Sequence, residues 1–298
     1  MVRWILSLIL ILLSLVVWMF VVFSIWKEYR YATLLFDMIL LYPILTIISY
    51  ILFTFAVIYW LVSPIYWILP LLFATLLTTF LSILCFRWIS SYRLKQYERL
   101  LSVLKKEDFE IKKFMDYFPL EKGNPKKINI FIRHDVDLSL KKIVKMTALE
   151  KKYGITSTVF FRLHSNKYSL QQAIPIIKKL HQEGFEIGFH YEVLTVTKGD
   201  EKAAIEIFEK ELTTLREHVP VQIVAAHGDK YKNRQIWSKL NKNKLNVFSA
   251  YDMKKNLYLS DAGGYDLFAK FGHHLYGELD KASQGDIVQI LIHADWWY

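Results

Sequence analysis

Charged residues are distributed so unevenly along this chain that its first 90 residues cannot share one folding environment with the rest. Residues 1–90 carry only six charged side chains, at Arg3, Lys27, Glu28, Arg30, Asp37 and Arg87. Three long, predominantly apolar runs cover residues 4–26, 36–62 and 65–89. Each run is longer than the about 20 residues that a membrane-spanning helix needs. The sequence therefore predicts a transmembrane region of about three helices at residues 1–90.

The Lys and Arg residues next to these runs predict an orientation. Lys27 and Arg30 lie in the first loop and a basic segment begins at Arg87, whereas the second loop has no positive charge. By the positive-inside rule, three spans place the N-terminus outside and the large domain in the cytoplasm of a multi-pass cell-membrane protein. Two spans, or an uncleaved secretory anchor, would place that domain outside, so both orientations stay open.

Residues 91–127 form a basic juxtamembrane linker. In this linker Leu94, Tyr97, Leu101 and Leu104 recur at helical spacing, with Lys and Arg at other positions. Such an amphipathic helix either lies on the membrane surface or caps the domain that follows. The sequence favours neither alternative.

Composition restricts the partners. The net charge of +10 is spread along the chain and no nucleic-acid-binding motif is present, so no nucleic-acid partner is predicted. A solvated basic surface is the first interpretation and contact with the anionic lipid bilayer the second. Cys85 is the only cysteine, which excludes an intrachain disulfide.

Residues 128–298 alternate between predicted strands and helices. The strands are expected at 128–133, 156–163, 185–191, 222–228, 246–252, 256–261 and 286–293. The helices between them are expected at 139–153, 169–184, 200–217 and 232–244. Such alternation is typical of a parallel sheet covered by helices. Seven strands without a dinucleotide-binding glycine motif favour a β/α barrel over an open sheet.

Polar side chains stand where these strands end. They are Asp135, Asp137, Arg162, His164, His190, His227, Asp261 and His293. In a β/α barrel all these ends lie on one rim, where active sites are built. Two carboxylates and several imidazoles on one rim predict a divalent metal, most simply zinc. A carboxylate beside that metal can accept a proton from the attacking water.

The motifs FIRHDVD, STVFFR, GFEIGFHYE, AAHGD, LYLSDAGG and LIHADWW occur in this order. Together they resemble the polysaccharide deacetylase family (carbohydrate esterase family 4, NodB-like), in particular the branch whose first motif reads His-Asp-Val-Asp. The resemblance covers residues 128–298 and leaves the membrane region outside. It implies a distorted (β/α)7-type barrel, here preceded by about three transmembrane helices. It also implies metal-dependent removal of N-acetyl groups from an amino sugar in a glycan or lipid-linked saccharide.

The resemblance also implies roles for individual residues. Asp135 corresponds to the catalytic base and His293 to the general acid. Asp137 and His190 correspond to metal ligands. Arg133 is expected to hold Asp135 in its ionised form.

Two departures from the family pattern leave alternatives open. Val136 separates the two aspartates, so their roles as base and ligand are exchangeable. Leu194 stands where a second metal-binding histidine is expected. His227 is the first candidate to replace it and His164 the second. The remaining alternative is that His227 only contacts the substrate and water fills the coordination shell.

Four residues are predicted to contact the sugar: Arg162, His164, Asp261 and Trp296. For Trp296, packing in the core is an equal alternative. Two other functions compete with deacetylation. One is hydrolysis of another non-peptide C–N bond on the same barrel, and the other is glycan binding without turnover.

Overall fold

The computed structural model describes residues 94–118, 121–261 and 278–297, together with Leu77 and Phe80. Within these ranges no helix is long and apolar enough to cross a membrane. The three predicted spans lie outside the described residues except for Leu77 and Phe80. The predicted division at residue 90 therefore stays a prediction.

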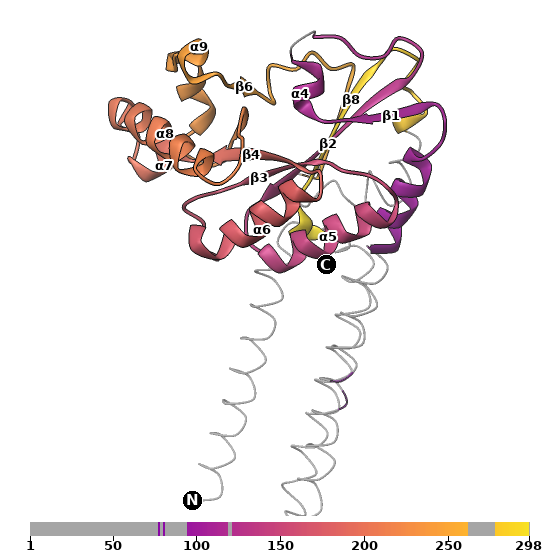
Figure 1. The fold of residues 1–298 in the computed structure, drawn as a ribbon, viewed down its shortest axis with the longest axis horizontal. Helices are drawn as coiled ribbons and strands as arrows, with labels where there is room; N and C mark the ends of the chain where they lie inside the picture. Colours follow the sequence, from indigo (N-terminus) through magenta and orange to yellow (C-terminus); the bar gives the residue numbers. More distant parts are fainter. Residues whose placement is uncertain (1–76, 78–79, 81–93, 119–120, 262–277, 298) are drawn as a thin grey trace, which may run out of the picture.

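One parallel sheet forms the centre of the domain (Figure 1). Its strands are β1 (Phe109–Lys112), β2 (Ile128–Val136), β3 (Thr158–Phe161), β4 (Glu186–Tyr191), β5 (Ile223–Ala226), β6 (Phe248–Ser249), β7 (Leu257–Ser260) and β8 (Ile287–Ile292). They follow the order β6-β5-β4-β3-β2-β8-β7, and β1 pairs with the first half of β2. All seven predicted strands are present, and β1 was missed. The order is that of a β/α barrel left open between β6 and β7.

The sheet is strongly curled. In a flat sheet β2 and β6 would lie about 19 Å apart, because four strand spacings of about 4.8 Å separate them. Phe131 of β2 and Ala250, directly after β6, nevertheless belong to one buried cluster with inward side chains of β3, β5 and β8. The strands therefore enclose an interior, as the barrel prediction requires.

Aromatic side chains fill the interior at the end opposite the carboxyl ends of the strands. Helix α4 (Phe114–Tyr117) places Phe114 in edge-to-face contact with Phe131 of β2 and Phe160 of β3. The carboxylate of Glu186 at the start of β4 accepts hydrogen bonds from the backbone N–H groups of Phe114 and Met115. Apolar packing and a half-buried carboxylate together close the end of the barrel opposite the rim.

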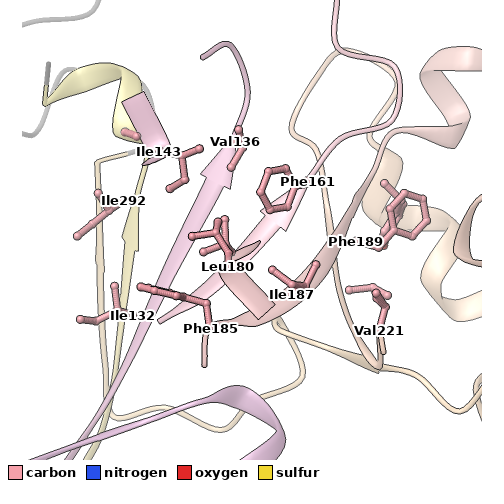
Figure 2. Packing of buried hydrophobic residues seen from close by; sticks show 14 of the residues in the cluster. Ile132, Val136, Ile143, Phe161, Leu180, Phe185, Ile187, Phe189, Val221 and Ile292 are labelled. Atoms are coloured by element: carbon pink, nitrogen blue, oxygen red, sulfur yellow. The ribbon is translucent and has the colours of Figure 1, made fainter. Parts of the chain in front are cut away.

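The outer face of the sheet is covered by helices. They are α5 (Leu140–Lys152), α6 (Leu170–Gln182) and α8 (Glu201–Arg216), which begin after the capping side chains of Ser139, Ser169 and Asp200. Figure 2 shows Ile143 of α5 and Leu180 of α6 facing outward side chains of the strands, such as Phe161 and Ile187. This second core holds the strands, and therefore the rim, in a fixed arrangement.

The amphipathic segment of the linker is a helix, at residues 94–104, and it caps the domain. Tyr97, Leu101 and Leu104 are buried in the outer core, as is Leu100. Its apolar stripe therefore faces the sheet, which decides between the two alternatives that the sequence left open.

The helix predicted at 232–244 is wrong in detail. The chain forms a 3-10 helix, η1 (Asn233–Lys239), and a short α9 (Lys242–Leu245). Leu240 between them is extended, and the side chain of Asn241 caps the second helix by accepting from the N–H of Lys244. A local cap inside the segment therefore interrupts the helical pattern.

Candidate active site at the strand ends

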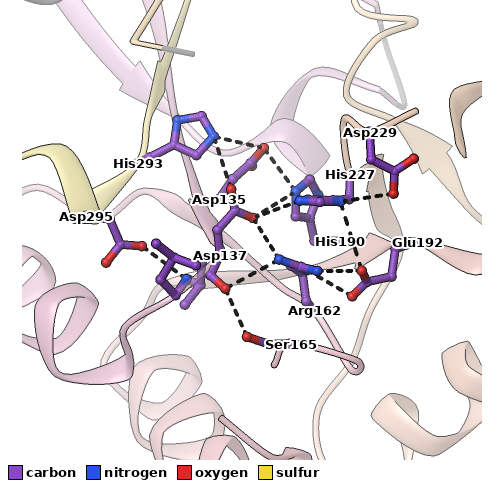
Figure 3. A network of polar contacts seen from close by, with 12 residues as sticks. Asp135, Asp137, Arg162, Ser165, His190, Glu192, His227, Asp229, His293 and Asp295 are labelled. Atoms are coloured by element: carbon purple, nitrogen blue, oxygen red, sulfur yellow. Dashed lines mark hydrogen bonds and ion pairs between the residues drawn. The ribbon is translucent and has the colours of Figure 1, made fainter. Parts of the chain in front are cut away.

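The end of β2 brings both aspartates of the first motif to the rim (Figure 3). The turn that carries Asp137 is held on two sides. The hydroxyl of Ser165 donates to the carbonyl of Asp137 at 2.9 Å. On the other side the N–H of Leu138 donates to Asp295 at 3.1 Å. The direction of the Asp137 carboxylate is therefore fixed by neighbouring loops as well as by the strand.

Arg133 and Asp135 form a buried bidentate pair on the inner face of β2. The Nε and Nη2 atoms of Arg133 lie 2.7 Å from Oδ1 and Oδ2 of Asp135, respectively. Burial alone would raise the pKa of Asp135. The charges of Arg133, His190 and His293 outweigh burial and lower this pKa. Asp135 is therefore ionised at neutral pH, the state in which it can accept a proton.

The carboxylate of Asp137 faces the side chains of both His190 and His227. Oδ1 of Asp137 lies 3.5 Å from Nε2 of His190 and 3.7 Å from Nε2 of His227. Two ligands that are 2.0–2.2 Å from a tetrahedral zinc ion lie about 3.4 Å apart. The two distances are close to this value, so the arrangement fits ligands of one ion.

The hydrogen bonds of these groups also fit a cation. Nδ1 of His190 lies 3.1 Å from the carbonyl of Ala225, which can only accept, so Nδ1 donates there and Nε2 is the nitrogen left to face Asp137. Burial, followed by the charge of His190, lowers the pKa of His227 and favours the neutral ring that a metal needs. Oδ1 of Asp137 is buried without a hydrogen-bond partner within the described part of the chain. A buried oxygen facing two imidazole nitrogens is the donor set that zinc prefers.

No three His, Cys, Asp or Glu side chains in the described ranges already form a complete metal-binding group. The two distances each join Asp137 to one histidine, and they do not show that all three side chains surround one position. The metal, and His227 as its third ligand, therefore stay predictions.

His293 follows β8 and faces both aspartates. Its Nε2 lies 3.8 Å from Asp137 and 4.0 Å from Asp135. Its Nδ1 lies 2.5 Å from Asp261, a fully buried carboxylate that also accepts from the indole N–H of Trp297 at 3.0 Å. Burial alone would lower the pKa of His293, but Asp261 first, then Asp135 and Asp137, raise it to about 9. The imidazolium is therefore a proton donor at neutral pH.

The other predicted residues take different positions. Arg162 forms a bidentate pair with Glu192, at 2.9 and 2.5 Å, and lies 3.9 Å from the carboxylate of Asp137. His164 hydrogen-bonds Glu211 on α8, and no described contact joins it to the aspartates. Asp261 lies beneath His293 rather than on the surface that a sugar would touch. Trp296 is half-buried within η2 (Ala294–Trp296).

Sequence reasoning missed three residues of this site. They are Glu192, Asn233 and Trp297. Glu192 stands in the quoted GFEIGFHYE motif, and Trp297 ends LIHADWW, so both were close to predicted residues. Asn233 lies in a segment assigned to an ordinary helix, and no local pattern marked it.

Solved structures with a similar fold include a carbohydrate esterase family 4 enzyme from Streptococcus mutans. It shares 14% identity over 55% of this chain and 73% of that one, with a TM-score of 0.40. The peptidoglycan deacetylase PdaC from Bacillus subtilis shares 15% identity over 59% and 83%, with a TM-score of 0.39. A family 4 carbohydrate esterase from Bacillus anthracis shares 16% identity over 63% and 74%, with a TM-score of 0.34.

No family model matches the chain, and no curated protein matches it by sequence. At the low identities and TM-scores of the solved structures, their likeness does not bear on function. The function has to be argued from the residues at the rim.

Proposed function

We propose that this protein is a metal-dependent N-deacetylase that hydrolyses the acetamide of an amino sugar in a glycan or lipid-linked saccharide. The observation that carries the proposal is the unpaired Oδ1 of Asp137, buried between Nε2 of His190 and Nε2 of His227. Two further groups lie beside this oxygen. They are the carboxylate of Asp135, which is paired with Arg133, and the protonated imidazole of His293. The order of the six motifs, which resembles the polysaccharide deacetylase family, supports the sugar acetamide as substrate.

Each group has a role in amide hydrolysis. Asp137, His190 and His227 would hold a divalent metal, most simply Zn²⁺, which supplies Lewis-acid activation of water and of the acetyl carbonyl. Asp135, kept ionised by Arg133, accepts a proton from the attacking water. His293, protonated beside Asp261, donates a proton to the amide nitrogen as the C–N bond breaks. The products are acetate and the free amino sugar.

The distribution of charge supports this assignment of the two aspartates. Both oxygens of Asp135 are engaged by Arg133, whereas Oδ1 of Asp137 has no hydrogen-bond partner among the described residues. A ligand needs a free lone pair, and a base needs a negative charge at neutral pH. Asp137 therefore suits the ligand and Asp135 the base.

The proposal is tested on full-length protein purified in detergent. Elemental analysis should find about one divalent metal per chain, and acetate should be released from N-acetylated chitooligosaccharides. Asp137→Asn should lose both metal and acetate release. A wild-type protein without bound metal would contradict the metal site. Bound metal without acetate release from any amino-sugar substrate would favour another C–N bond or glycan binding alone.

We further propose that residues 1–90 anchor the domain in the membrane, with the domain in the cytoplasm. The apolar runs and the basic residues Lys27, Arg30 and Arg87 support this orientation. Protease added to intact cells should then leave residues 91–298 uncut. Digestion of that domain without permeabilisation would place it outside, and the substrate with it.

A further inference from the structure

Asn233, the first residue of η1, is a buried amide with all its hydrogen-bonding capacity in use. Its Oδ1 accepts from the backbone N–H groups of Leu194 at 2.8 Å and Thr195 at 3.2 Å. Its Nδ2 donates to the hydroxyl of Thr195 at 2.8 Å and to the carbonyl of His227 at 3.2 Å. A carboxamide offers two donors and two acceptor lone pairs, so this side chain is saturated and cannot flip.

The first pair of bonds caps a helix from outside. Helix α7 (Val193–Val196) follows Glu192, whose side chain makes no capping hydrogen bond. Orphan N–H groups in a first turn need acceptors, and Oδ1 of Asn233 supplies one for Leu194. It also shares the N–H of Thr195 with the carbonyl of Glu192, to which that N–H donates at 3.0 Å. The amide thereby ties α7 to the segment after β5.

The second pair of bonds reaches His227 along two routes. Directly, Nδ2 of Asn233 binds the carbonyl of His227, while the N–H of His227 donates to Tyr191 at 2.8 Å, so the peptide groups on both sides of its Cα are held. Indirectly, Asn233 donates to Thr195, and the Thr195 hydroxyl donates to Asp229. Oδ2 of Asp229 lies 3.6 Å from Nδ1 of His227.

The indirect route has a defined direction. Asn233 donates to Thr195, and Thr195 donates to Asp229. The route ends at the carboxylate of Asp229, and a carboxylate attracts the N–H of an imidazole. A proton on Nδ1 of His227 leaves the lone pair on Nε2, the atom that faces Asp137 at 3.7 Å. Nδ1 of His227 faces two carboxylates, Asp229 at 3.6 Å and Glu192 at 4.0 Å, and makes no hydrogen bond to either. The buried amide therefore acts on the ring chiefly through the backbone of His227 and on Asp229 through Thr195.

We propose that Asn233 is a positioning residue for His227, which acts through the backbone of His227 and through the Thr195–Asp229 relay to present Nε2 to the metal. The inference rests on the proposed function, because it takes His227 as a metal ligand. Asn233 itself touches neither metal nor substrate. Its hydrogen bonds hold His227 in place although this residue lies in the loop after β5 rather than on the strand.

The test measures Zn²⁺ affinity rather than turnover. Full-length protein is stripped with a chelator and titrated with Zn²⁺ against a chromophoric competitor. Outer partners of ligating histidines typically contribute about 10–100-fold in metal affinity. Asn233→Ala should therefore raise the Kd for Zn²⁺ by this factor, and Co²⁺ substitution should show an altered visible absorption spectrum.

Asn129 supplies a matched control. It is also fully buried, with four hydrogen bonds through its amide, but it lies at the start of β2, opposite the rim. Asn129→Ala should destabilise the fold by a similar amount and leave the Kd unchanged. Equal Kd values for wild type, Asn129→Ala and Asn233→Ala would overturn the inference.

A double substitution separates a positioning role from a general one. If Asn233 acts through His227, adding Asn233→Ala to His227→Ala should not raise the Kd further. A further rise comparable to that in the wild-type background would overturn the inference. If Asn233→Ala does not fold, Thr195→Val breaks only the relay and should raise the Kd by about tenfold. An unchanged Kd there would also count against it.

Failure of the inference and failure of the proposed function give different results. A wild-type chain that binds no Zn²⁺ contradicts the metal site itself. A wild-type chain that binds one Zn²⁺, with Asn233→Ala binding it equally well, leaves the metal site standing and removes only the role of Asn233.

Discussion

The two faces of β2 carry two buried polar clusters that differ in one respect. On the outer face His134 bonds Glu150 at 2.7 Å and the carbonyl of Ile292 at 3.3 Å. Glu150 also accepts from Tyr97 at 2.5 Å and from Ser157 at 2.7 Å. We call His134, Glu150, Tyr97 and Ser157 the outer cluster. Every side-chain nitrogen and oxygen in it has a partner, and all four residues are fully buried.

On the inner face and rim the polar atoms are not all satisfied. Oδ1 of Asp137, Nδ1 of His227 and Nη1 of Arg133 lack hydrogen-bond partners among the described residues. Natural proteins leave few buried polar groups unpaired, and those that stay unpaired need an explanation. The saturated cluster stabilises the fold, whereas Oδ1 of Asp137 at the rim is left free to bind a ligand. On one strand, therefore, the residues of the outer face serve stability and those of the inner face and rim serve activity.

The sharpest way to break this comparison is to remove the proton donor on the rim. His293→Ala should lower kcat by about 10²–10⁴-fold, because a positioned acid contributes that much. Metal content should change little, since His293 is not a predicted ligand. The unfolding midpoint should fall, because the variant leaves the buried carboxylate of Asp261 without its charged partner. Full activity in this variant would remove His293 from the mechanism.

In the outer cluster a loss of stability is expected without a loss of activity. Glu150→Ala leaves His134, Tyr97 and Ser157 without their shared acceptor and should lower the free energy of unfolding by about 3–5 kcal/mol. Activity per folded molecule should persist. Glu183→Ala is the control, because its pair with Lys151 at 2.9 Å lies near the surface and is worth at most about 1 kcal/mol. Similar losses in the two variants would show that the outer cluster is not specially stabilising.

The faces of β2 are predictable from strand alternation, which places Arg133 and Asp135 on one side and His134 on the other. In the structure Arg133 bonds Asp135, whereas His134 bonds Glu150 of the outer cluster. The seven strands were also predictable, because Gly, Pro and polar turns separate the apolar runs. β1 was missed since its four residues, FEIK, carry too short an alternation.

The partners of these residues were not predictable. Glu150 reads as an ordinary acidic residue among the lysines of an amphipathic helix, and only packing shows that it is buried against His134. Asp261 was expected at the sugar, yet it supports His293 because the end of β7 lies beside the end of β8. Asn233 acts across 39 residues of chain on Leu194. Such contacts follow from tertiary register, which local patterns do not encode.

A substitution of Asp261, beneath the rim, should lower kcat by less than His293→Ala does. Asp261→Asn keeps the shape of the side chain but removes the charge that faces Nδ1 of His293 at 2.5 Å. Groups that orient a functional histidine typically contribute about 10–100-fold. The kcat should fall within that range, less than in His293→Ala, while the Kd for Zn²⁺ stays unchanged. A loss of metal would instead place Asp261 in the support of the metal site.

The smallest effect is expected at His164, which belongs to neither cluster. Hydrogen bonding to Glu211 raises the pKa of His164 above its usual value of about 6.5, and burial only partly opposes this. Because the folded-state pKa is the higher one, the stabilisation is complete below the unfolded pKa. It is lost as pH rises through the folded pKa.

The side chain of His164 is 44% exposed, so its pair with Glu211 contributes only about a few tenths of a kcal/mol. Unfolding of wild type and His164→Gln should therefore differ slightly at pH 5.5 and converge above neutral pH. A kcat that also falls in His164→Gln would restore this histidine to the site as a substrate contact.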